Sequence, residues 1–189
     1  MARRCVSGRA IASRSRVVML KLFGWTMITA VALGSTLSLA RAEAMNAAAP
    51  ICKSGGSPAI LVEVIGVKSE TGVIRVQAYG GNPAHYFDKG SYIERIDMPT
   101  LQAREVCVPV PKPGTYAISV RHDVNGNGKS DMRDGGGMSG NPSLSVWDLI
   151  TKSKPDPRQV QVQVGSGVTP VRVVMNYVQG GSFKPVARQ

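Results

Sequence analysis

Short runs of β-branched and aliphatic residues, each ended by turn-forming residues, recur between residues 59 and 178 and constrain the fold more than any other feature. The clearest run is Gln-Val-Gln-Val-Gln-Val at residues 159–164, where polar and apolar residues alternate with the period of a β-strand. No run shows the period of a long helix. About seven short strands with closely spaced turns predict an all-β protein, an antiparallel β-sandwich with an Ig-like or transthyretin-like topology.

The expected strands cover residues 59–67, 73–79, 92–98, 103–110, 116–122, 159–164 and 170–177. The first two are predicted to form a β-hairpin across the turn at 68–72. Pro109 places the fourth at a strand end or a sheet edge. The segment 135–157 is rich in glycine and proline and is expected to be irregular, with one helical turn or a short strand at 145–150.

A run of oxygen-bearing residues follows the strand expected at 116–122 and has the spacing of a twelve-residue calcium loop. Alternate residues of a tightly curled loop can direct several oxygens at one hard cation. Gly128 stands where such a loop turns sharply, because glycine tolerates positive φ. The expected ligands are Asp123, Asn125, Asn127, the backbone carbonyl of Lys129, Asp131 and Asp134.

An alternative interpretation of this loop is a turn whose side chains cap its own backbone, since Asn-Gly is a strong turn former. If the loop binds a metal, we expect calcium ahead of magnesium and weak affinity. Two of the first three ligands are neutral asparagines, and Asp134 replaces the usual glutamate at position twelve. A strand enters the loop, so the helical flanks of an EF-hand are not expected.

The first 42 residues predict an export signal. A basic region ends at Lys21, an uncharged stretch follows from Leu22 to Leu39, and residues 40–42 offer a cleavage site, with a second at 42–44. Met19 is an alternative start, and an uncleaved membrane anchor is the alternative to a signal peptide. After cleavage we expect a flexible arm at 43–58, a β-sandwich domain at 59–178, a polar tail at 179–189 and no stable membrane span. The expected location is periplasmic or secreted.

A net charge of +11 is typical of nucleic-acid-binding proteins, but the distribution of the basic residues along the chain argues against that function. Seven of the basic residues precede position 43, and the remainder carries a net charge of about +4. No basic cluster interleaved with aromatic residues remains there, so no nucleic-acid binding is expected.

Two cysteines, Cys52 and Cys107, remain after the signal segment, which itself contains Cys5. An even pair in an oxidising compartment predicts a disulfide, with two free buried thiols as the alternative. The bridge would close a loop of roughly 55 residues, nominally worth about 4 kcal/mol.

The chain resembles a known bacterial family in four features. These are Leu61–Val67 followed by Thr71–Tyr79, Pro113–Val120, the run His122–Asp131, and a terminal pair of valine-rich strands. Together they are similar to an uncharacterised exported family, the domain of unknown function two-one-four-one. The resemblance covers roughly residues 59 to 178 and implies an exported β-sandwich without an assigned activity.

No catalytic residue is expected. His122 lies on the inward face of its strand and is interpreted as a buried structural histidine, His85 as part of a surface loop, and no nucleophile elbow supports a hydrolase. Four aromatic residues are interpreted first as core or loop anchors and alternatively as a binding platform: Trp147, Tyr86, Phe87 and Tyr92. The sequence predicts a non-enzymatic exported protein with an unknown envelope or extracellular ligand. The alternative is a carbohydrate- or peptide-binding module that uses the 135–157 loop.

Overall fold

The computed structural model describes residues 49–186. The predicted export signal at 1–42 and the first part of the predicted arm lie outside the described residues. No helix in the described part of the chain is long and apolar enough to cross a membrane.

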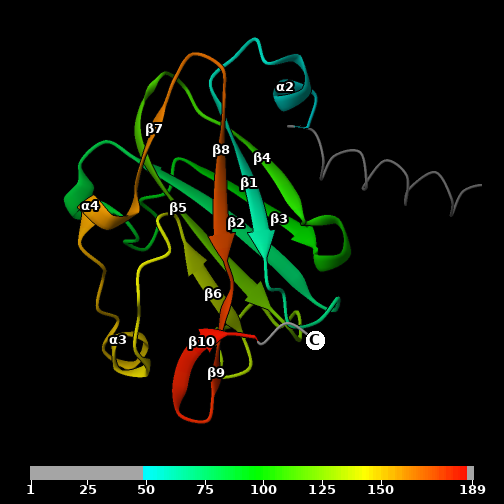
Figure 1. Ribbon diagram of the computed structural model, residues 1–189, viewed down its shortest axis with the longest axis vertical. Coiled ribbons are helices and arrows are strands. Elements are labelled where there is room, and N and C mark those ends of the chain that lie inside the picture. Colours follow the sequence, from blue (N-terminus) through cyan, green and yellow to red (C-terminus); the bar gives the residue numbers. More distant parts are fainter. Residues whose placement is uncertain (1–48, 187–189) are drawn as a thin grey trace, which may run out of the picture. The chain divides into compact units, whose positions relative to one another are not determined.

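In the described part of the chain, ten strands form two sheets, and the smaller sheet has three of them in the order β4–β1–β8 (Figure 1). Its strands are β1 (Ala59–Ile65), β4 (Glu105–Pro109) and β8 (Val168–Val174). β4 pairs antiparallel with β1, and Pro109 is the last residue of this edge strand, as its sequence predicts. β8 pairs with β1 in parallel, so this sheet is mixed rather than wholly antiparallel.

The larger sheet has the order β10–β9–β6–β5–β2–β3, and β7 pairs separately with β5. β5 is the longest strand and pairs with β2, β6 and β7. The strands of this sheet are β2 (Val73–Gly80), β3 (Glu94–Pro99), β5 (Gly114–Asp123), β6 (Gly135–Met138), β7 (Gln161–Val164), β9 (Asn176–Gln179) and β10 (Ser182–Pro185).

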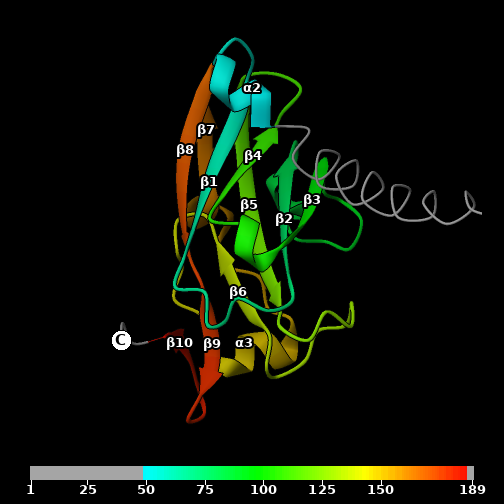
Figure 2. The same cartoon turned by 90° about the vertical axis from the view of Figure 1, so that its right-hand side faces the viewer.

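The two sheets face each other and bury their apolar faces between them, with β1 and β8 on one side and β2 and β3 on the other (Figure 2). Alternation along β2 places Ile74, Val76 and Ala78 in this core. Ile118 and Val120 of β5 pack in the same core, together with valines of β1, β4 and β8. The predicted fold class, an all-β sandwich, is confirmed.

Within residues 49–186, α2 precedes the first strand and four further short helical segments connect the strands, and none of the five has more than six residues. α3 begins with a capping box, in which Ser145 accepts a hydrogen bond from the backbone of Asp148 and the Asp148 side chain accepts one from the backbone of Ser145. The segments are α2 (Ala49–Ser54), η1 (Pro83–His85), η2 (Thr100–Gln102), α3 (Val146–Thr151) and α4 (Pro157–Val160).

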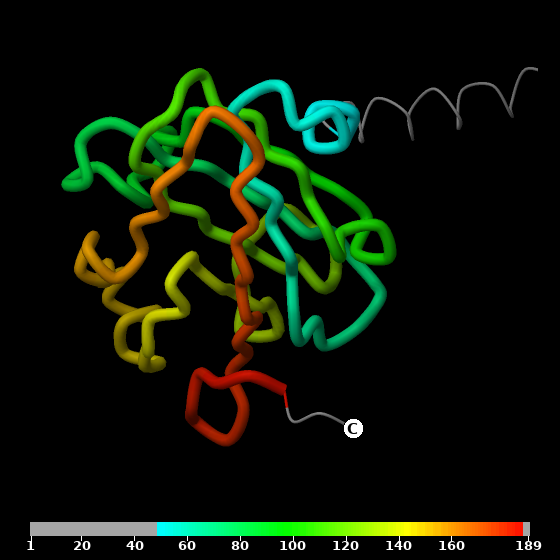
Figure 3. Tube along the Cα trace, turned by 45° about the horizontal axis from the view of Figure 1, so that its top comes forward, coloured from blue at the N-terminus to red at the C-terminus, as the bar shows by residue number. Residues whose placement is uncertain are grey.

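A disulfide joins Cys52 of α2 to Cys107 of β4, with 5.9 Å between the two Cα atoms. The predicted bridge is confirmed, and it fixes the end of the arm to the edge of the smaller sheet. The same residues 49–54 that were expected to be flexible form α2. α2 and the β9–β10 hairpin lie at opposite ends of the described domain, as the cyan and red segments show (Figure 3).

Several predicted elements are wrong. β1 and β2 do not form a hairpin but belong to different sheets, so the turn at 66–72 crosses from one layer to the other. Residues 49–186 form ten strands rather than about seven, because the expected strand at 170–177 is divided between β8 and β9, the glycine run forms β6, and the tail supplies β10. The expected strand at 159–164 begins as helix α4 and becomes β7 only at Gln161.

Candidate functional site

β5 carries the candidate loop and is anchored at its end by His122. This side chain is fully buried, as predicted, and lies in the core next to Tyr177. Its Nε2 is 2.8 Å from the carbonyl oxygen of Thr71, which only accepts, so Nε2 carries the proton. Nδ1 therefore accepts from the Tyr177 hydroxyl at 2.7 Å. The Tyr177 oxygen in turn accepts from the backbone N–H of Lys68 at 3.0 Å.

Burial is the main cause that raises the pKa of Tyr177 to about 12, so the hydroxyl keeps the proton that it donates to His122. Every polar atom of the His122–Tyr177 pair has a hydrogen-bond partner, which makes the network rigid. This hydrogen-bond network fixes the end of β5 against the turn at residues 66–72, which crosses from one sheet to the other.

The next residue, Asp123, opens the loop and is 4% exposed. One of its oxygens accepts from the N–H of Asn127 at 3.2 Å, and the other accepts from the N–H of Gly128 at 2.7 Å. Asn125 accepts from the same Asn127 N–H, and Asn127 accepts from the N–H of Lys129. Gly128 has φ +76°, which confirms the sharp turn expected there.

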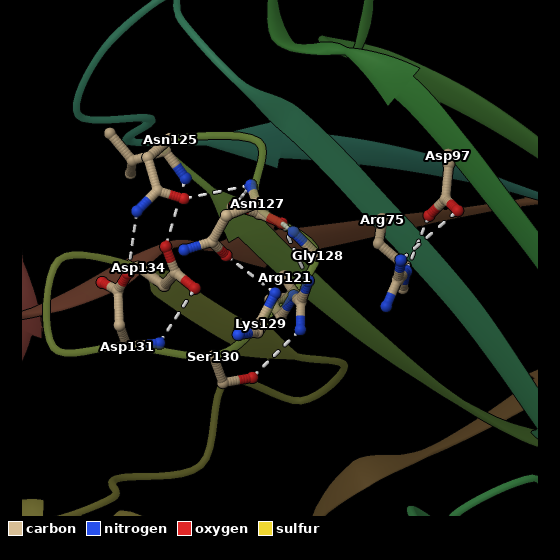
Figure 4. Close-up of polar contacts among 12 residues, drawn as sticks. Arg75, Asp97, Arg121, Asn125, Asn127, Gly128, Lys129, Ser130, Asp131 and Asp134 are labelled. Carbon is tan, nitrogen blue, oxygen red and sulfur yellow. Dashed lines mark hydrogen bonds and ion pairs between the residues drawn. The ribbon is translucent and has the colours of Figure 1, made fainter.

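The second acidic half of the loop folds back on the first (Figure 4). Asp134 is 8% exposed, and its two oxygens accept from the backbone N–H groups of Val124 and Asp131. Asp131 is exposed and accepts from the Asn125 amide at 2.8 Å. The backbone N–H of Arg133 is the main cause that holds the pKa of Asp131 below its ordinary value.

Arg121 belongs to this site, although the predicted ligand set does not contain it. Its guanidinium donates to the Asp123 carboxylate and to the Ser130 hydroxyl, both at 3.0 Å. It is also directly opposite Arg75 in the sheet, and Arg75 is neutralised by Asp97 at 2.7 Å. The period of two along β5 was the available signal, because it puts residues 121 and 123 on one face.

The loop therefore contains the ligand types of a hard-cation site, but their oxygens do not converge on one point. Carboxylate and amide oxygens are the ligands that calcium takes, and most of these loop oxygens accept one hydrogen bond and keep a second lone pair. The exception is the Asp123 oxygen that accepts from both the Gly128 N–H and the Arg121 guanidinium. No group of three His, Cys, Asp or Glu side chains within residues 49–186 is gathered closely enough to hold a metal. Side-chain capping of the loop's own backbone, the alternative interpretation, is present.

The other sequence candidates lie elsewhere. Tyr86 is buried in a small second core on the outer face of the larger sheet, where Phe87 packs beside it. His85 is exposed and lies 3.2 Å from the Asp88 carboxylate. Trp147 is 72% exposed on α3, whereas Tyr92 is 37% exposed beyond the η1 segment. These four aromatic residues are thus divided between core and surface and do not form one platform.

The segment 135–157 is more ordered than its composition predicts, since it contains β6 and α3. α3 has no buried residue. Its apolar side chains face outward from the sheet or line a groove beside the loop.

A family model described as an uncharacterized protein conserved in bacteria, DUF2141, matches residues 62–172. Comparisons with curated proteins and with solved structures gave no match. The matched range begins within β1, ends within β8 and contains β5 with the whole candidate loop. The resemblance expected from the sequence is confirmed.

Proposed function

The chain belongs to the bacterial family DUF2141, whose members are uncharacterised, and within it we propose an exported, non-enzymatic β-sandwich whose 123–134 loop binds calcium as a structural ion. The proposal does not identify the ligand that the protein binds in the envelope or outside the cell. The Cys52–Cys107 bridge supports export, because disulfides persist in oxidising compartments such as the periplasm.

The observation that carries the calcium proposal is the burial of two carboxylates at the ends of an otherwise exposed loop. Asp123 and Asp134 are both buried, and Arg121 is the cation paired with Asp123. Asp134 forms no ion pair with any residue in 49–186 and relies on two backbone N–H groups. A buried carboxylate is costly without a compensating charge, and a divalent cation would supply that charge.

Calcium would take oxygens from Asp123, Asn125, Asn127, the Lys129 carbonyl, Asp131 and Asp134. Exposed members of this set must turn inward, which lowers affinity, and neutral amides lower it further. A dissociation constant of about 10⁻⁴ to 10⁻³ M is expected, as in extracellular modules. The ion would hold the long connection between β5 and β6 in one conformation.

Thermal unfolding with calcium, magnesium or chelator tests the proposal. At ~10 mM calcium, binding in this range adds about 1.4–2.7 kcal/mol of stability, which raises the melting temperature by roughly 3–10 °C. Magnesium should give a smaller shift, because it demands stricter geometry.

The variant Asp134→Asn removes the buried charge that calcium would neutralise. We expect it to lose the calcium response and to be less stable than the parent protein in chelator, because the amide nitrogen cannot accept one of the two backbone N–H groups. Asp156→Asn is the matched control, since this exposed carboxylate pairs only with Arg158 in the described part of the chain. No shift in the parent protein, or an equal shift in Asp134→Asn, would refute calcium binding at this loop.

A second candidate function, carbohydrate or peptide binding by the 135–157 segment, is favoured by one observation. Trp147 presents an aromatic ring that is 72% exposed on α3, and such rings stack on sugars and on apolar peptide side chains. Titration of Trp147 fluorescence with a panel of glycans and peptides tests it, with Trp147→Phe as the reference for background signal. An unchanged emission spectrum across the panel contradicts this candidate.

A further inference from the structure

A groove of about 500 Å³ lies on the outer face of the larger sheet, between α3 and the β9–β10 hairpin. Figure 2 shows α3 beside β9 at this end of the domain. The volume is within the range of about 300–1,000 Å³ typical of small-molecule sites. The walls are apolar and consist of Met132, Val146, Leu149, Ile150, Val178 and Phe183.

The floor of the groove is formed by β6, which contains three consecutive glycines, and core packing requires glycine at the first and the third of them. A Cβ on Gly135 would lie 2.3 Å from the Tyr177 ring, and a Cβ on Gly137 would lie 2.6 Å from both Val173 and the backbone oxygen of Val174. Core packing therefore excludes any side chain at these two positions. The middle residue, Gly136, is not under this restriction.

A Cβ on Gly136 would meet nothing closer than the Phe183 ring at 3.6 Å, an ordinary contact, and its φ is not positive. Neither packing nor backbone conformation requires glycine there. Gly136 lines the groove, so a longer side chain at this position would stand inside it. The absence of a side chain keeps the floor open.

The polar end of the groove carries free hydrogen-bond donors on cationic groups. Arg121 lies opposite Gly136 in the β5–β6 pairing and lines the groove. Its Nε is buried and has no partner among the described residues. Lys152, which follows α3 with φ 55°, also lines the groove and forms no ion pair with residues 49–186.

Two carboxylates, Asp131 and Asp134, also line the groove, and each of their oxygens accepts one hydrogen bond from the protein. Both oxygens of Asp134 and one of Asp131 accept backbone N–H groups, and the other oxygen of Asp131 accepts the Asn125 amide. The donors that remain without a partner belong to Arg121 and Lys152. They are suited to an anion, and a guanidinium is suited above all to a carboxylate.

We propose that this groove binds a small organic anion with a carboxylate head and an aliphatic or aromatic tail. The carboxylate accepts hydrogen bonds from Arg121 and Lys152. The tail lies over Gly136, between the apolar side chains of α3 and those of the β9–β10 hairpin. The groove borders the proposed calcium loop, since Asp131 and Asp134 line it, but anion binding there does not require calcium.

Calorimetric titration with octanoate, 1-octanol and acetate, all in chelator, tests the two halves of the proposal. Octanol has the same tail without the charge, and acetate has the charge without the tail. Octanoate should bind at least about tenfold more tightly than either. Octanol lacks the hydrogen bonds of the carboxylate, acetate lacks the apolar contacts of the tail, and each loss weakens binding by about that factor. Equal affinity for octanoate and octanol overturns the carboxylate assignment, and no octanoate binding overturns the site.

Two kinds of variant locate the site. Gly136→Val fills the floor and should abolish octanoate binding without lowering the melting temperature, because β-branched residues suit strands. Gly165→Val is the matched control, since Gly165 has open space around it, no positive φ and no place in the groove. Lys152→Gln should weaken octanoate about tenfold while leaving the melting temperature unchanged. Unchanged octanoate affinity in Gly136→Val refutes the proposed position.

Discussion

The strand β6 allows the packing argument to be tested by placing the same residue, alanine, at two neighbouring positions, 135 and 136. Alanine at position 135 places a Cβ 2.3, 2.5 and 2.9 Å from three atoms of the Tyr177 ring, whereas carbon atoms pack best at about 3.5–4.0 Å. Either β6 or the ring must move by about 1 Å or more. The ring cannot move freely, because its hydroxyl is bonded to His122 and to the backbone of Lys68.

The cost of Gly135→Ala follows from these contacts. Overpacking of a core costs about 1–3 kcal/mol, and displacing the Tyr177 hydroxyl from a buried partner costs about 1–3 kcal/mol more. The free energy of unfolding should therefore fall by about 2–6 kcal/mol. Gly136→Ala meets no close atom and restricts the unfolded chain, so it should be neutral or stabilising by up to about 1 kcal/mol.

Urea unfolding followed by circular dichroism measures both free energies, with equal m-values as the check that the same transition is compared. A second background isolates the cause. In Tyr177→Ala the ring is gone, so Gly135→Ala should cost much less than it does in the parent protein, which is a coupling between touching residues. If Gly135→Ala and Gly136→Ala differ by less than about 0.5 kcal/mol, the steric explanation of the glycine run is wrong.

Three other changes have expected outcomes. Tyr177→Phe leaves Nδ1 of His122 without its donor and should lower the free energy of unfolding in urea by about 1–3 kcal/mol; a neutral result would mean that water replaces the hydroxyl. Replacing Cys52 and Cys107 together by alanine should cost about 2–4 kcal/mol, and a smaller loss would indicate residual structure in the unfolded chain. Burial opposes ionisation of Asp97, but two arginines outweigh it and hold its pKa below the ordinary value. Its contribution to stability is therefore complete above pH ~4 and lost as pH falls below that, so Asp97→Asn should differ from the parent protein at pH 6 and converge with it in acid.

The sequence was informative where a local pattern has one physical interpretation. Alternation along β5 correctly predicted the inward face that ends in His122, and the even cysteine pair predicted the bridge. The turn at Gly128 was predictable because positive φ there excludes most other residues. The loop spacing also led to Asp123 and Asp134, the two residues of the site that the structure buries.

The pairing of strands was not predictable in the same way. β1 and β2 have inward residues that suit either pairing in one sheet or packing face to face across two sheets. Alternation shows which side chains of a strand are buried, but it does not show which other strand pairs with that strand in the sheet. The parallel partner of β1 is β8, more than one hundred residues later, and no local signal in residues 59–65 points to it.

β6 was missed because glycine has little intrinsic preference for strands. Its pairing with β5 and with β9 and the position of the Tyr177 ring over Gly135 make it a strand, and these are contacts between distant segments. Arg121 was missed for a related reason. A calcium-loop spacing counts residues from position 123 onward, whereas the cation that neutralises Asp123 comes from the strand before it.

Arg121 joins the two proposed sites, which yields one prediction that depends on both. Its guanidinium is bound to Asp123 at 3.0 Å and also lines the groove. Calcium on Asp123 would weaken that ion pair, since the carboxylate would be shared with a divalent cation, and would leave the guanidinium freer to bind a carboxylate ligand. Octanoate should therefore bind more tightly in saturating calcium than in chelator, and by linkage calcium should bind more tightly in octanoate by the same factor. In Arg121→Gln both increases should vanish. If both ligands bind the parent protein and neither affects the other, the shared guanidinium does not couple them.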